Sequence, residues 1–319
     1  MNKVALIIVF NHNYEANLSR LDAIYSSRFK NIWYVMPFYQ GHRDDVISVY
    51  ENSYYFQGYI AKALEQIKNN NFEHYIIIGD DLILNPNINE NNYRDYFKVD
   101  DETAFVPEPF LLNDIKVTKP NRPMAPFWHW ALTALNFNLK QPGIECANYL
   151  PNYDEALALL KTHGYDFTPE FPIGAYKYNQ LLSFSTDKTE LGLKTDYLKK
   201  FGTKIIKNII YKKSLQYPLI GSYSDCVVIP HKHVQHIIQY FGITAAMHLF
   251  VEIGLPTSIA LAVPKIISES AISHKGLTFW LPSEVAEFEA RYGNSFKKLQ
   301  EEYPLNTLYV HPVKLSRWK

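Results

Sequence analysis

Cysteine is scarce in this chain, which has only Cys146 and Cys226 among its 319 residues. Two cysteines cannot form a disulfide framework or a four-cysteine zinc site. An excess of one charge is also missing, because 32 basic side chains balance 32 acidic ones. Phosphate binding requires a local excess of Lys and Arg, so this balance argues against nucleic acid as the main partner.

Long hydrophobic runs are absent as well. The first apolar run, Val4 to Phe10, is shorter than a signal peptide requires and has no small-residue cleavage site after it. The best candidate for a membrane span, Phe241 to Ile267, is interrupted by His248, Glu252 and two prolines. A spanning helix needs about 20 apolar residues. We therefore expect a cytoplasmic protein without a membrane span.

The composition is otherwise that of a folded globular protein, with 47% hydrophobic and 20% charged residues. Aromatic residues reach 15%, which suits sugar-stacking surfaces and a Tyr-rich core equally.

The first hundred residues alternate between strand-like and helix-like patterns. Continuous β-branched runs predict strands buried on both faces, and apolar spacings of three and four residues predict helices. The expected strands are 3–10, 31–37 and 74–79, and the expected helices are 17–29 and 59–67. This order predicts an α/β fold with a mostly parallel central sheet flanked by helices. In such sheets, ligands bind beyond the carboxyl ends of the strands.

The remainder of the chain divides at about residue 216. Residues 107–216 are rich in Pro, Asn and aromatic side chains and are too long for a simple loop, so we expect a large irregular insertion with one helix at 153–163. Later strands are expected at 225–230 and 307–312, with a helix beginning at 233 and an apolar helical segment at 250–263 that Pro256 interrupts. We expect a single domain over 1–319, made of two α/β halves (1–110 and 216–319) with the insertion (111–215) between them.

Two adjacent carboxylates, Asp80 and Asp81, follow the expected strand 74–79. Adjacent carboxylates at a buried strand end repel each other unless a cation or hydrogen-bond donors compensate. Mg²⁺ or Mn²⁺ would compensate, because these ions prefer oxygen ligands. The alternative is that both residues cap the next turn, where Asp is common.

The segment HYIIIGDDLILNP, residues 74–86, resembles the acidic strand end of nucleotide-sugar glycosyltransferases with the GT-A fold, a Rossmann-related fold. The resemblance implies that Asp81 is a metal ligand for Mn²⁺ or Mg²⁺ and that Asp80 supports the bound donor. Gly79 stands where many members of the family carry a further acid.

Three later segments resemble the same family and occur in the expected order. The resemblance implies that 1–110 is a nucleotide-sugar-binding half and that 216–319 is an acceptor or catalytic half. IGSYSDCVVIP resembles the loop that lines the donor pocket, which implies donor contacts from Gly221 and Ser222. HLFVEIGLP resembles the helix start that carries the catalytic base of inverting members, and Glu252 is the match. TLYVHP resembles the late strand with a metal-binding histidine, which His311 matches.

Further donor-binding candidates lie at the same expected sheet edge. Phe10, His12 and Asn13 end the first strand, where a nucleotide base or ribose lies in this fold, and Gly58 precedes a helix whose first turn could contact a diphosphate. A solvent-exposed loop is the alternative for His12 and Asn13.

Each candidate also has a structural alternative. Glu252 could pair with a neighbouring cation, His311 could be a histidine with ordinary hydrogen bonds at a strand end, and Gly221 could permit a tight turn. The histidines at 231, 233, 236 and 248 suggest zinc, but no Cys or acid lies at a conventional zinc spacing nearby. The aromatic cluster at 127–130 could stack a sugar or anchor the insertion in a core.

The sequence therefore predicts a metal-dependent glycosyltransferase that moves a sugar from a nucleoside-diphosphate donor to a hydroxyl of a carbohydrate or other acceptor. Glu252 would be the general base if the reaction inverts configuration. The alternative is a non-catalytic module that binds nucleotide or carbohydrate on the same scaffold, which the glycine at position 79 motivates. A nucleotidyltransferase is a third hypothesis, but its glycine-rich phosphate loop is missing from residues 11–20.

Overall fold

The computed structural model describes residues 4–50, 53–112, 137, 145–167, 195, 199, 203, 206 and 217–319. These residues form a mixed α/β fold around a seven-stranded sheet with the order β10-β6-β9-β4-β1-β2-β3. The strands are β1 (Val4–Val9), β2 (Ile32–Pro37), β3 (Val46–Val49), β4 (His74–Gly79), β6 (Thr103–Phe105), β9 (Cys226–Pro230) and β10 (Lys265–Ile267). The sheet is mostly parallel, and β9 runs antiparallel to both of its neighbours.

The central strands are apolar along their whole length because both faces of the sheet are covered. In β1, Leu6 and Ile8 belong to the hydrophobic cluster on one face, while Ala5 and Ile7 belong to the cluster on the other. Alternate residues of a strand point to opposite faces, so two covered faces require a continuous apolar run. The expected buried strands at 3–10, 31–37 and 74–79 are thereby confirmed.

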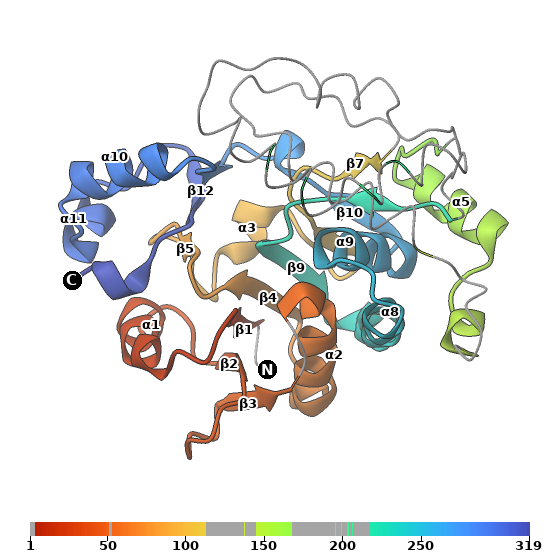
Figure 1. Cartoon of the computed structure of the whole chain (residues 1–319), viewed down its shortest axis with the longest axis horizontal. Coiled ribbons are helices and arrows are strands. Elements are labelled where there is room, and N and C mark those ends of the chain that lie inside the picture. Colours follow the sequence, from red (N-terminus) through yellow and green to blue (C-terminus); the bar gives the residue numbers. More distant parts are fainter. Residues whose placement is uncertain are drawn as a thin grey trace.

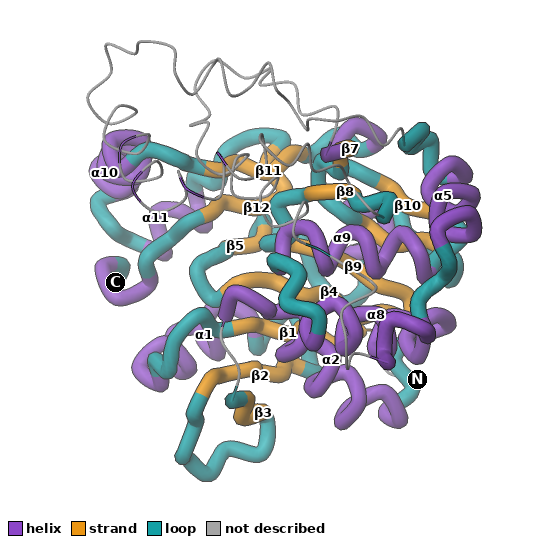
Figure 2. The backbone as a smooth tube through the Cα atoms, turned by 45° about the vertical axis from the view of Figure 1, so that its right-hand side comes forward, coloured by secondary structure: helices purple, strands orange, loops and turns teal. Residues whose placement is uncertain are grey.

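Helices cover the two faces with different parts of the chain (Figures 1 and 2). α2 (Phe56–Ile67), α8 (Val234–Ala246) and α9 (Val251–Ala262) pack together on one face. α1 (Leu18–Tyr25) and α3 (Tyr93–Phe97) cover the other face with the C-terminal helices α10 (Pro282–Tyr292) and α11 (Phe296–Glu301). Both ends of the chain therefore contribute to one hydrophobic layer.

Smaller elements complete the described part of the chain. β12 (Thr307–His311) lies between β11 (Lys275–Thr278) and β5 (Ile83–Leu84), and β7 (Phe110–Leu111) pairs with β8 (Ile220–Gly221). α5 (Tyr153–Thr162) confirms the expected helix in the insertion. Short 3-10 helices lie at Glu15–Asn17, Ser53–Tyr55, Lys68–Asn70, Glu145–Tyr149, His231–His233, Glu269–Ala271 and Leu315–Arg317.

The prediction that Pro256 interrupts the helical segment was wrong, because α9 continues through it. A proline inside a helix leaves the carbonyl four residues earlier without its N–H partner. Here that carbonyl belongs to Glu252, and it accepts a hydrogen bond from the Ser222 backbone N–H at 2.9 Å. The helix tolerates Pro256 because another segment satisfies the carbonyl that the proline leaves free.

The order of the strands defines a switch point in the sheet. From β1 the chain proceeds through β2 to β3 on one side, and then returns to place β4 on the other side of β1. The connections at the carboxyl ends of β1 and β4 therefore lead away from each other. In open α/β sheets, ligands bind in the crevice at such a point.

Candidate functional site

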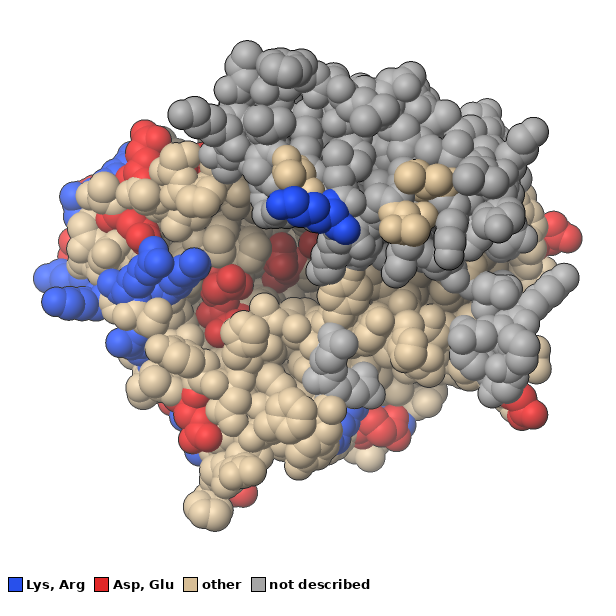
Figure 3. All heavy atoms as spheres, viewed as in Figure 1, with Lys and Arg blue, Asp and Glu red and all other residues tan. Residues whose placement is uncertain are grey.

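The switch point brings together the ends of three strands. Backbone hydrogen bonds join Asp80 N–H to the Val9 carbonyl at 3.0 Å and Gly79 N–H to the Asp225 carbonyl at 3.1 Å. Because β9 is antiparallel to β4, its first residues lie at the same edge as the last residues of β4. In the orientation of Figure 3, the surface is hollowed near the middle of this face, and acidic side chains lie inside the hollow.

Asp81 and His311 meet at this edge although they come from opposite ends of the chain. The antiparallel register pairs Val310 with Ile83, and the Val313 N–H donates to the Asp81 carbonyl at 2.6 Å. The Asp81 Oδ1 therefore lies 3.3 Å from His311 Nε2. The two residues that the family resemblance assigns to one metal are direct neighbours.

Asp225 was missing from the predicted site. Its Oδ2 lies 3.5 Å from His311 Nδ1, on the opposite side of the ring from Asp81. That ring nitrogen is buried and has no hydrogen-bond partner at normal distance. The signal in the sequence was an acid directly before the strand 226–230, but its value depends on the antiparallel direction of that strand, which the sequence does not reveal.

The charges around the His311 ring shift its pKa upward. Burial alone would lower it, but Asp225, Asp81 and Glu252 outweigh burial and raise the pKa of His311 to about 9. The effect is mutual. Burial would raise the pKa of Asp81, but His311 outweighs burial and holds the pKa of Asp81 below its usual range. For Asp225 burial dominates, and its pKa is raised. Without a bound cation, the imidazolium is the charge that compensates these carboxylates.

Asp80 lies beside this group, but its carboxylate is held by hydrogen bonds rather than by His311. The Asn17 side chain and the Asn11 backbone N–H both hydrogen-bond to its carboxylate. Burial, and then the negative charge of Asp81, raise the pKa of Asp80 to about 7. The two neighbouring acids thus have different surroundings, and Asp81 is the one that faces His311.

Glu252 lies in the first turn of α9, close enough for its charge to act on His311. An acid there also interacts favourably with the helix dipole. Its backbone carbonyl is fixed by Ser222, whose hydroxyl donates to the Pro107 carbonyl in the buried interior. A Cβ on Gly221 would lie 2.6 Å from the Phe110 ring, so glycine is required there for close packing. Ser222 therefore holds the backbone of Glu252 in place, and Gly221 permits the close approach of Phe110.

The remaining donor-binding candidates differ in accessibility. His12 and Asn13 are exposed beyond β1, and Asn13 Nδ2 donates to the Phe38 carbonyl at 2.9 Å. Gly58 lies half-buried in the first turn of α2. Phe10 is fully buried against Tyr34, so its side chain belongs to the core and only its backbone lies near the edge.

The start of α2 is anchored beside the start of α9. Gln57 Nε2 donates to the Leu249 carbonyl at 2.6 Å, and the ring centroids of Tyr54 and Phe250 are 4.6 Å apart. The first turns that carry Gly58 and Glu252 therefore lie at one edge of the molecule.

The histidines that suggested zinc do not converge. His231 contacts Tyr75, His233 contacts Glu102, His236 stacks on Tyr240 and His248 stacks on Tyr55. Across the described ranges, no three His, Cys, Asp or Glu side chains are grouped so that they alone could hold a metal ion. The aromatic cluster at 127–130 lies outside the described residues.

Comparison with protein-family models and with curated proteins finds no match to this chain. Among the residues described, none of the helices has the length and apolar character needed to cross a bilayer.

Proposed function

We propose that this protein is a glycosyltransferase with a GT-A-like fold, which binds a nucleoside-diphosphate sugar and a divalent metal ion at the switch point of its sheet. The observation that carries the proposal is the contact between Asp81 and His311 at the carboxyl ends of β4 and β12. The contact supports the proposal because the sequence resemblance pairs these residues independently of their distance in space. The position also agrees with the rule that ligands bind at the switch point of an α/β sheet.

The donor set fits Mn²⁺ or Mg²⁺ that is shared with a diphosphate. Such ions are commonly held by one or two protein ligands together with water and substrate phosphates, so a pair of ligands is sufficient. Asp81 would contribute a carboxylate oxygen and His311 its Nε2. Bound there, the metal would neutralise the charge that develops on the leaving diphosphate.

Asp225 has a positioning role in this proposal. A metal-binding histidine usually donates its other ring N–H to a carboxylate or carbonyl, which fixes the tautomer and the orientation of the ring. Asp225 Oδ2 faces His311 Nδ1 and can accept that hydrogen bond after a small shift from 3.5 Å. Nε2 then keeps its lone pair on the side of Asp81.

Glu252 is the proposed general base, which accepts the proton of the acceptor hydroxyl as the new glycosidic bond forms. Its backbone is fixed by the hydrogen bond from Ser222, and its carboxylate acts electrostatically on His311. The proposed base therefore lies near the proposed metal ligands, and a transfer reaction needs the two in proximity.

Calorimetric titration with UDP, GDP, CDP, ADP and dTDP, each with Mn²⁺, tests the proposal. We expect one of these nucleotides to bind only when Mn²⁺ is present. We expect Asp81→Asn to lose this Mn²⁺-dependent binding. His74→Gln, which changes a histidine at the other end of β4, serves as the matched control. If no nucleotide binds to the wild type, the proposal is wrong; if one binds but no donor is hydrolysed or transferred, the non-catalytic binding module replaces it.

A further inference from the structure

Lys314 follows His311 by three positions in the sequence and is exposed beside the candidate site. The residue before it, Val313, donates its backbone N–H to the Asp81 carbonyl at 2.6 Å. Burial raises the pKa of Asp81, His311 lowers it, and the positive charge of Lys314 lowers it further. Lys314 is therefore close enough for its charge to act on the proposed metal ligand.

The backbone around Lys314 is fixed although its side chain is exposed. Val313 and Leu315, on either side of it, are both buried. The Lys314 carbonyl also accepts a hydrogen bond from the Arg317 backbone N–H at 2.9 Å. The ammonium group thus extends into solvent from an anchored position.

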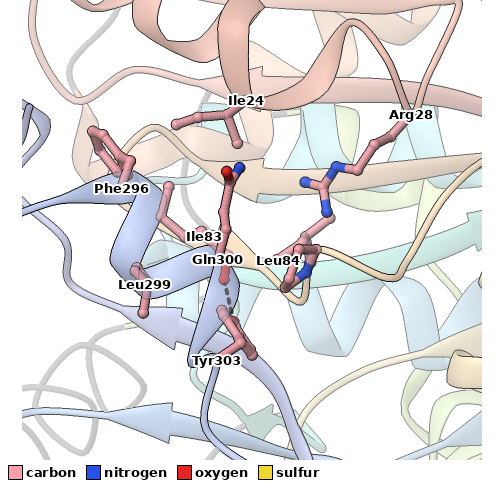
Figure 4. A pocket seen from close by; sticks show the side chains of 9 residues that line it. Ile24, Arg28, Ile83, Leu84, Phe296, Leu299, Gln300 and Tyr303 are labelled. Carbon is pink, nitrogen blue, oxygen red and sulfur yellow. Dashed lines mark hydrogen bonds between the residues drawn. The ribbon is translucent and has the colours of Figure 1, made fainter. Parts of the chain in front are cut away.

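The segment that carries Lys314 is tied to α11, and α11 is tied to the sheet. The Lys319 N–H donates to the Asn294 carbonyl at 2.8 Å, just before α11. In Figure 4, Phe296 and Leu299 of α11 line a small apolar pocket together with Ile83 of β5. The position of Lys314 relative to Asp81 is therefore set by packing and not by the chain end alone.

The neighbouring cations on this flank already have partners. Arg20 donates to the Leu315 carbonyl, and Arg317 pairs with Glu289 at 3.3 Å. Across the described ranges, no carboxylate lies within ion-pair distance of Lys314. Figure 3 shows basic side chains beside the acidic hollow. Among these three cations, Lys314 is the one whose charge is free to meet a ligand.

A nucleoside diphosphate would meet several carboxylates at this edge. The charges of Asp225, Asp81 and Glu252 all act on His311. One divalent metal would have to compensate these acids as well as the phosphates, so a second cation would favour binding. A lysine ammonium suits this task, because it is a compact charge on a flexible stem and binds phosphate without a fixed geometry.

We propose that Lys314 is a donor-binding residue that contacts the diphosphate group beside the metal. The inference rests on the proposed transferase function and deepens it, because it gives the leaving group a second cationic contact. A cation placed where negative charge develops also favours departure of the diphosphate.

Two affinities that should change in different ways test the assignment. Lys314→Met removes the charge and keeps the length of the side chain. We expect the Kd of the nucleotide that binds from the panel of UDP, GDP, CDP, ADP and dTDP, each with Mn²⁺, to rise about tenfold. The affinity for Mn²⁺ alone, measured by electron paramagnetic resonance, should stay equal or increase, because a cation near Asp81 has been removed.

Two further variants serve as controls for this measurement. Lys314→Arg keeps the charge and should retain most of the nucleotide affinity. Lys30→Met removes an exposed lysine that lies before β2, at the opposite end of the sheet, and should bind both ligands as the wild type does.

The outcomes separate this assignment from the function on which it rests. If the wild type binds a nucleotide and Lys314→Met binds it equally well, the role of Lys314 is overturned and the transferase proposal stands. A parallel loss of Mn²⁺ affinity in Lys314→Met would indicate a distorted site and would also overturn the role. If the wild type binds no nucleotide, both proposals are wrong.

Discussion

A histidine lies at each end of β4, and the pKa values of the two shift in opposite directions. The pKa of His74 is lowered, and the pKa of His311 is raised. At the start of the strand, His74 is fully buried, with Tyr93 Oη 2.9 Å from Nδ1 and the Asp100 carbonyl 3.0 Å from Nε2. Burial, as the largest cause, lowers its pKa. At the other end, His311 stands between two carboxylates and its pKa is raised to about 9.

The difference separates a structural histidine from a candidate functional one. Neutral His74 satisfies both ring nitrogens with uncharged partners, and such an arrangement needs nothing further. The end with His311 concentrates acids that repel one another, and Nδ1 has no hydrogen bond at normal distance. Strongly shifted pKa values at the sheet edge where α/β proteins bind ligands are characteristic of functional sites.

Among the variants that test this comparison, Asp81→Asn should have the largest effect on turnover and donor binding. It removes one negative charge from the proposed metal site, and we expect turnover to fall by about 10³-fold or more, together with metal-dependent donor binding. Melting of the metal-free protein should change little, because the lost pairing with His311 is offset by less repulsion from Asp80. Unchanged Mn²⁺ affinity would remove Asp81 from the site.

Asp225→Ala tests whether the carboxylate behind His311 orients the ring. Removal of such a partner typically weakens metal binding by about 10–100-fold. Electron paramagnetic resonance of free Mn²⁺, measured with the nucleotide present, gives this affinity directly. Asp225→Asn keeps an acceptor oxygen and should lose less. Equal affinities for Asp225→Ala and the wild type would contradict the positioning role.

His74→Gln sharpens the comparison from the structural end. Because the folded pKa of His74 is lowered, the unfolded chain binds its proton first as the pH falls. The stability from neutral His74 is thus fully present above about pH 6.5 and is lost below it, by at most about 1.4 kcal/mol per pH unit. Urea unfolding at pH 7.5 and 5.5 should show a smaller loss for the variant than for the wild type. Identical losses would mean that His74 does not titrate in this way.

Gly79→Ala should have the smallest effect. A Cβ at this position would lie 3.2 Å from Asp81 Oδ1, so the carboxylate must move by a few tenths of an ångström. We expect Mn²⁺ affinity to weaken by about threefold, which corresponds to about 0.6 kcal/mol, without a change in fold. The same resonance titration measures it, and an increase in affinity would show that Asp81 is not yet in its metal-binding position.

The sequence revealed those parts of the fold that have long or distinctive patterns. Continuous apolar runs identified β1, β2 and β4, whereas the three-residue strands β6 and β10 are too short for any periodicity to be visible. The helix α10 was missed although its signals are present, with Pro282 at its start and Gly293 at its end.

The candidate site was only partly predictable for a related reason. Asp81 was identifiable because it follows a long buried strand, and His311 was found through the family resemblance alone. Asp225 depends on the direction of β9, and the contact between Asp81 and His311 depends on the register of β12 with β5. No turn joins β5 to β12, so tertiary packing rather than the local pattern of either strand decides their pairing.

The position of β12 in the chain means that His311 is synthesised after all three acids of the candidate site. A ribosome that has reached residue 300 has already made Asp81, Asp225 and Glu252, but not the strand that carries His311. The nascent chain at that stage carries the three acids without the imidazolium that compensates them in the folded protein. This edge therefore reaches its final charge balance only when one of the last strands of the described fold is in place.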